Sequence, residues 1–162
     1  AFLRVVFLII LRDYFATFYA MLMAGFILAM LSQRFVFVNA ELKSEVVTGI
    51  LLMMAACLMY FSGDRNAINL ISPTLLGCGI GIIGARFLLF FLKLSLHCQR
   101  GTSQSTFFLS WEFGISLGIF LGYYFFYNDI SAMYIVALTI LCMAMLMYLL
   151  FTHTWYIKNK NR

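Results

Sequence analysis

The chain of 162 residues is 64% hydrophobic and only 10% charged, with a formal net charge of +5. Soluble domains carry roughly 25% charged residues, and a folded domain of this size still exposes about a third of the surface of its unfolded chain. A mean hydropathy of +0.98 therefore excludes a soluble domain. The composition predicts an all-α, polytopic integral membrane protein, with the lipid bilayer as its surroundings.

Long apolar runs predict five full transmembrane helices in a single membrane domain covering residues 1–162. The predicted spans are residues 14–36, 45–63, 68–92, 105–127 and 131–153. The first apolar run, Ala1–Leu11, is shorter than the about 20 residues that cross a bilayer, and the polar pair Arg12–Asp13 follows it. We expect this run to be the end of a truncated helix, and the chain to be the C-terminal part of a longer protein.

Basic residues concentrate at one end of the alternating spans. That side receives Arg34, Lys43, Lys93, Arg100, Lys158, Lys160 and Arg162. The other side receives Arg12 and Arg65, beside Asp13, Asp64 and Asp129. Because basic residues mark the cytoplasmic side, we expect a cytoplasmic C-terminus in a bacterial plasma (inner) membrane. No basic stripe with interleaved aromatic residues is present, so the positive charge does not indicate nucleic-acid binding.

Two ionisable residues lie inside the predicted spans. Arg86 precedes the helix end at Lys93, and Glu112 follows the helix start near Ser105, so that both lie about 10 Å inside the same boundary. Opposite charges at one depth in neighbouring helices can pair, which predicts an Arg86–Glu112 pair. This pair either fixes helix register or lines a substrate or ion pathway, to which Ser116 would contribute from the face of Glu112. His153 is expected at the membrane interface.

Glycines at helical spacing predict close helix packing. The positions are Gly77, Gly81 and Gly84 in the third span and Gly114, Gly118 and Gly122 in the fourth. In each span these glycines lie largely away from the charged residue. A dinucleotide-binding site is excluded because its glycine motif requires a preceding strand.

Catalytic and metal-binding motifs do not occur in this sequence. It has no H-E-x-x-H, no Ser-His-Asp set and no pair of carboxylates within the spans. Cysteines stand far apart, without a C-x-x-C pair, at positions 57, 78, 98 and 142. We therefore expect neither an enzyme nor a metal site or cofactor.

The segment Arg100-Gly101-Thr102, followed by S-W-E-F-G-I-S-L-G around Glu112, resembles the major facilitator superfamily of secondary transporters. In that family a cytoplasmic turn of the type R-G-small joins the tenth helix to the eleventh. The resemblance implies that Arg100 and Gly101 form this turn, that the spans are helices eight to twelve, and that Ala1–Leu11 ends the seventh. The loop after the first span departs from the family pattern, since it offers only Gln33-Arg34 and Lys43.

The resemblance further implies part of a six-helix transporter half, in which two halves rock about a central site. Arg86 and Glu112 would then lie on cavity-lining helices. The leading hypothesis is transport of a small solute by alternating access, with the N-terminal half of the same transporter as partner and a proton as candidate coupling ion. The alternatives are a non-catalytic membrane subunit, or helical scaffold, of a larger complex and, third, a membrane enzyme that acts on lipid.

Overall fold

The computed structural model describes residues 2–38, 41–63, 67–126 and 129–159, with the side chains of residues 2–15, 67 and 97 excepted. The described residues form helices without a strand: α1 (Phe2–Phe35), α2 (Leu42–Met59), η1 (Tyr60–Ser62), η2 (Ala67–Ile71), α3 (Ser72–Leu94), η3 (His97–Gln99), α4 (Arg100–Phe125), α5 (Ile130–Met147), η4 (Tyr148–Thr152) and α6 (His153–Asn159). Five stretches are long and apolar enough to cross a membrane, namely residues 16–35, 42–62, 68–94, 100–125 and 130–159. The all-α, polytopic membrane fold predicted from the composition is confirmed.

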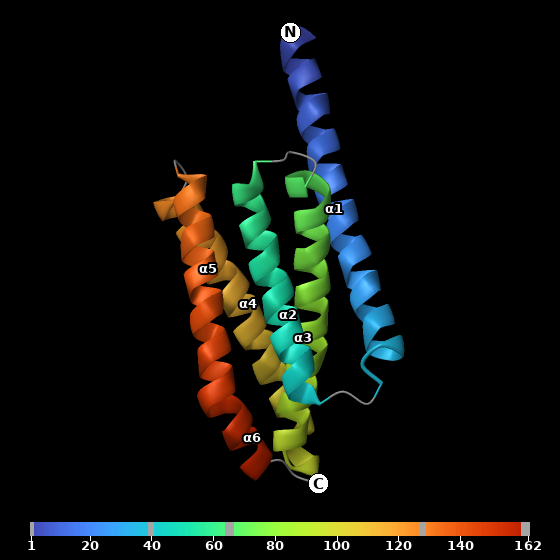
Figure 1. Ribbon diagram of the computed structural model, residues 1–162, viewed down its shortest axis with the longest axis vertical. Coiled ribbons are helices and arrows are strands. Elements are labelled where there is room, and N and C mark those ends of the chain that lie inside the picture. The colour runs from blue at the N-terminus through green and yellow to red at the C-terminus, as the bar shows by residue number, and fades with distance from the viewer. Residues whose placement is uncertain (1, 39–40, 64–66, 127–128, 160–162) are drawn as a thin grey trace.

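The first helix is longer than predicted. α1 continues through Arg12 and Asp13 without interruption, so the predicted break between a truncated helix and the first span is wrong. No glycine or proline occurs before Gly25, and charged residues alone do not end a helix. Figure 1 shows the N-terminal part of α1 extending beyond the ends of the other helices.

α3 is the central helix, and its small residues allow three neighbours to approach. Gly77 meets α1, where a Cβ at this position would overlap the backbone oxygen of Leu22. Gly79 faces α2, where a Cβ would lie 2.7 Å from the backbone oxygen of Gly49. Gly25 of α1 is the partner of Gly77, Gly49 of α2 is the partner of Gly79, and a Cβ on Gly81 would lie 2.7 Å from Ala29 Cβ of α1.

The two connections at the basic end of the bundle are shorter than predicted. α2 begins at Leu42, before the predicted start of this span at residue 45, so Glu45 belongs to the first turn of the helix. α4 begins at Arg100, so Arg100 and Gly101 are helical and the predicted turn lies earlier, at residues 95–99. Ser103 Oγ donates to Phe91 O (2.8 Å), which ties this first part of α4 to the end of α3.

α4 and α5 cover less of the bundle. α4 packs against α3 near Phe107, its single buried residue, and most of its length is exposed. α5 packs against α2, and its first turns are joined to η1 by the stacked rings of Tyr60 and Tyr134, whose centroids lie 4.2 Å apart. Because the helices alternate in direction (Figure 1), the basic residues of the described connections meet at the end where α6 lies. Arg65, Lys160 and Arg162 lie outside the described residues.

Candidate functional site

A buried ion pair joins α2 to α3. Arg86 Nε donates to Glu45 Oε2, and the side chain of Glu45 is 0% exposed whereas that of Arg86 is 23% exposed. The helices approach closely here because Gly49, one turn after Glu45, and Gly79, two turns before Arg86, meet without side chains between them. Two glycines therefore bring the guanidinium within reach of a carboxylate that the bundle encloses.

Glu45 is only partly satisfied by this pair. Its second oxygen, Oε1, is buried and has no hydrogen-bond partner among the described residues. An unsatisfied buried polar atom costs about 1–3 kcal/mol, and more when it is charged. The position of Glu45 in the first turn of α2 offsets part of that cost, because the N-terminal end of a helix favours negative charge.

The segment from Tyr148 to Tyr156 packs against the same end of α2 and α3. Tyr148 is buried in one cluster with Val46 and Ile50, and its ring centroid lies 6.0 Å from that of Phe87. Tyr156 stacks on Phe90 of α3 with 4.9 Å between centroids. The end of the last span thus packs over the region where the ion pair lies.

A π-helical turn sets the positions of the polar groups in this segment. The backbone N–H of His153 donates to Tyr148 O, five residues earlier, which brings the two rings to 5.9 Å between centroids. In an α-helix, residues five apart point in different directions, whereas one π turn aligns them. The hydroxyl of Tyr148 and Nδ1 of His153 are both buried without a partner in the described part of the chain. The His153 side chain as a whole is half-buried.

The predicted Arg86–Glu112 pair is wrong. α4 meets α3 at Gly84, which lies about 200° around the helix from Arg86. Trp111 fills that contact, where a Cβ on Gly84 would lie 3.6 Å from its ring, and the next residue, Glu112, is exposed. Arg86 points instead toward α2, a helix that precedes α3 in the chain.

The remaining predicted site residues lie on the outer surface of α4. Ser116 is exposed one turn after Glu112, so the two share a face. A Cβ on Gly114 or Gly118 would meet nothing within 4 Å, whereas one on Gly122 would lie 3.7 Å from Met133 Sδ. Gly114 and Gly118 therefore do not pack against any part of the chain that the structure describes.

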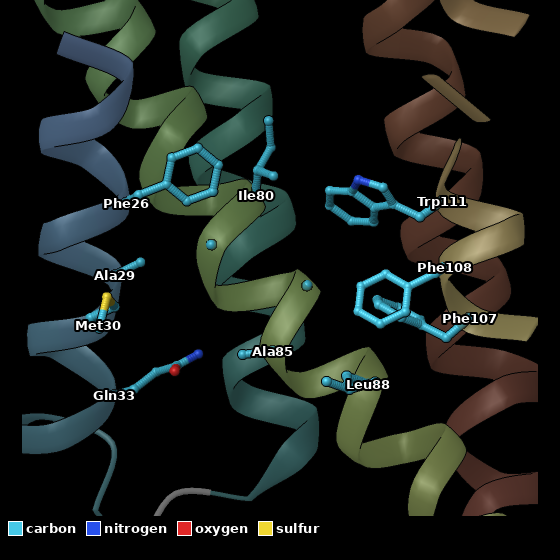
Figure 2. A pocket seen from close by; sticks show the side chains of 12 residues that line it. Phe26, Ala29, Met30, Gln33, Ile80, Ala85, Leu88, Phe107, Phe108 and Trp111 are labelled. Carbon is cyan, nitrogen blue, oxygen red and sulfur yellow. The ribbon is translucent and has the colours of Figure 1, made fainter. Parts of the chain in front are cut away.

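A pocket of about 330 Å³ opens between α1, α3 and α4. Figure 2 shows the rings of Phe107, Phe108 and Trp111 from α4 lying across from Phe26 and Met30 of α1. At its lower end lies the amide of Gln33, whose Nε2 donates to Ile82 O (3.3 Å). The pocket is largely apolar, and the ion pair does not line it.

The described residues contain no group of three or more His, Cys, Asp and Glu side chains that could hold a metal ion. Comparison with protein-family models, curated proteins and solved structures finds no match for this chain. What this site does must therefore be argued from its own residues: an enclosed carboxylate, a guanidinium, a phenol and an imidazole at one end of the bundle.

Attachment of the C-terminal segment is testable. Tyr156→Ala is expected to lower the free energy of unfolding by about 3 kcal/mol, because it removes a buried ring from Phe90. The matched control, Trp155→Ala, removes a ring that is 54% exposed and should change stability by less than about 0.5 kcal/mol. Unfolding in mixed detergent–SDS micelles measures both, and equal losses would show that α6 does not pack on α3 as described.

Proposed function

We propose that this chain is part of a secondary transporter of the major facilitator type, which moves a small solute by alternating access. The observation that carries the proposal is the buried Glu45–Arg86 pair, in which one carboxylate oxygen has no partner in the described part of the chain. Charged residues inside membrane spans are costly and mark transport pathways or proton relays in many membrane proteins. In a purely structural pair, a hydrogen-bond donor to each carboxylate oxygen would increase stability. Glu45 Oε2 has such a donor in Arg86, but Oε1 has none among the described residues.

Two further observations support transport. The pocket between α1, α3 and α4 has the volume of a small ligand site, for which about 300 Å³ is the lower limit. Gly114 and Gly118 are exposed on one side of α4, and the opposite face, which carries Glu112 and Ser116, is exposed as well. A second helical half, the N-terminal half of the same transporter, is the partner we propose for this face. We also propose a bacterial inner membrane with a cytoplasmic C-terminus, since basic residues gather at that end.

A helical scaffold or non-catalytic subunit of a larger complex is the second candidate. The exposed glycines of α4 favour it, since small residues at four-residue spacing let another helix approach closely. In a scaffold, however, an enclosed carboxylate oxygen without a partner among the described residues would cost stability and serve no structural purpose. We therefore rank transport first.

The complete protein, reconstituted in liposomes, distinguishes these candidates. We expect it to take up a small solute from a panel of sugars, peptides and lipophilic cations, and Glu112→Gln to reduce uptake while leaving the free energy of unfolding within about 0.5 kcal/mol of the wild type. Ser110→Ala is the control on the same helix, since its hydroxyl donates to the backbone of its own helix at Phe107 O. Uptake of no panel member, with stable co-purification of other subunits, would favour the scaffold.

A further inference from the structure

Three buried polar atoms at one end of the bundle have no partner in the part of the chain that the structure describes: Glu45 Oε1, the Tyr148 hydroxyl and His153 Nδ1. Their hydrogen-bonding capacities are complementary. An ionised carboxylate only accepts, a phenol both donates and accepts, and an imidazole nitrogen does either, according to its protonation. One added proton makes Glu45 Oε1 a donor as well as part of an accepting group. The phenol oxygen or the imidazole nitrogen could then accept a hydrogen bond from it.

The three groups belong to one packed region. Val46, the residue after Glu45, shares a buried cluster with Tyr148, and the Tyr148 ring lies 5.9 Å from that of His153. His153 begins α6, the segment that ends in Lys158 and Asn159. The π turn is what aligns His153 with Tyr148, and π turns are frequent at functional sites.

We propose that Glu45 is the proton-binding residue of this protein, and that a proton on Oε1 takes the place of the charge interaction with Arg86. The proposal rests on the transport function above and names its coupling ion. His153 and Tyr148 are proposed as the groups that hydrogen-bond the protonated carboxyl when the bundle rearranges. Both side chains come from the last span, so a shift of that span relative to α2 and α3 would couple proton binding to movement.

Protonation of Glu45 forms one bond and removes one negative charge. A proton from water on the basic side forms an O–H bond at Oε1, and the carboxylate becomes a neutral carboxylic acid. Arg86 then loses its counter-ion, so the net charge of the pair rises from zero to plus one. A buried unpaired cation is costly, but the guanidinium is already 23% exposed and can extend further toward solvent. Release of the proton restores the pair.

The surroundings favour a proton over a metal cation. The ionisable groups contributed by the elements around this end of α2 are Arg86 from α3, Tyr148 from η4, and His153 and the buried Tyr156 from α6, while Cys142 lies earlier in the chain, on α5. Two further charged residues lie close to Glu45 in sequence, Glu41 at the N-cap of α2 and Lys43 within the helix, and both are exposed. Glu45 is thus the one carboxylate among these enclosed groups, and Arg86 beside it repels a metal ion, whereas a proton binds covalently and neutralises Glu45.

Infrared difference spectroscopy of the purified complete protein in lipid nanodiscs tests proton binding without transport. Between alkaline and acidic buffer, we expect a carbonyl band of a protonated carboxyl in an apolar environment, at higher frequency than exposed carboxyls show. Glu45→Gln should abolish this band, and Glu41→Gln, which removes an exposed carboxyl one turn earlier, should retain it. A wild type without the band, or a band that persists in Glu45→Gln, would overturn the proposal.

Transport measurements then separate the proposal from the function on which it rests. With a transported solute, Glu45→Gln should lose accumulation driven by a pH gradient, and His153→Gln should shift the pH dependence of accumulation. Gradient-driven accumulation that is intact in Glu45→Gln contradicts the proposal. If the wild type transports nothing, the proposed function fails, while the infrared experiment still decides whether Glu45 binds the proton.

Discussion

Replacing Arg86 by glutamine is expected to lower the free energy of unfolding by about 3 to 5 kcal/mol, the cost of leaving a buried charge without its partner. Glu45, which is 0% exposed, would lose the Arg86 donor to its Oε2, while its Oε1 already has no partner among the described residues. Glu45→Gln should cost less, about 2 kcal/mol, since the guanidinium left behind is partly exposed and can reach solvent. Unfolding in mixed detergent–SDS micelles gives both values.

The double variant identifies the partner. In Arg86→Gln/Glu45→Gln both charges are removed, and the loss should be smaller than the sum of the single losses by about 2 kcal/mol, as for residues in direct contact. The matched control is Arg86→Gln/Glu112→Gln, whose effects should add, because Glu112 is exposed on another face of the bundle. Coupling with Glu112 and none with Glu45 would refute the pair described here.

Composition alone was sufficient for the membrane-spanning architecture. A spanning helix requires about 20 apolar residues, and this requirement holds whatever the neighbours are. Helix faces could be predicted for a similar reason, because they do not depend on the neighbouring helices either. The angles between Gly77, Gly79 and Arg86 follow from rotation about a single helix axis. The sequence correctly separated the face of α3 that carries Gly77 from the face that carries Arg86, as the contacts with α1 and α2 show.

The identity of the neighbouring helix could not be predicted in this way. Arg86 and Glu112 lie on consecutive helices at similar depth, which made them appear to be partners, but consecutive helices need not meet along the faces that carry the charges. Glu45 is the first residue of the second predicted span, and a charged residue at the end of an apolar run normally marks the membrane boundary. The burial of Glu45 depends on the contact between Gly49 of α2 and Gly79 of α3. A contact between two helices cannot be predicted from the local sequence pattern of either one.

The π turn between Tyr148 and His153 had no sequence signal at all. The apolar run continues through Tyr148–Thr152 without a glycine or proline, so an uninterrupted α-helix was the natural expectation. The extra residue in the turn changes which side chains point inward, and Nδ1 of His153 is buried in this arrangement. Packing of Tyr148 against Val46 and Phe87 accompanies this local change and supplies a reason for it.

The second large effect is expected at Gly77 in α3. Gly77→Ala should destabilise the protein by about 2 kcal/mol, because a methyl group at this site would overlap the backbone of Leu22, and overpacking against backbone costs about 1–3 kcal/mol. A flexible side chain could move aside, but the carbonyl of a helix cannot move without shifting α1. The effect is measured as the change in unfolding midpoint in mixed detergent–SDS micelles.

Gly84→Ala is the matched control, on the same helix two turns later. Its methyl group would lie 3.6 Å from the ring of Trp111, an ordinary contact distance, and alanine favours helix over glycine by about 1 kcal/mol. We therefore expect stability to be unchanged or increased. A loss of stability in Gly77→Ala together with a gain in Gly84→Ala would show that the backbone of α1 packs directly against α3 at Gly77. Equal small changes in stability would show that the two helices are farther apart. Since α1 and α3 also form two walls of the pocket, Gly77→Ala should alter this cavity as well, whereas a change at the ion pair on the opposite face of α3 should leave it intact.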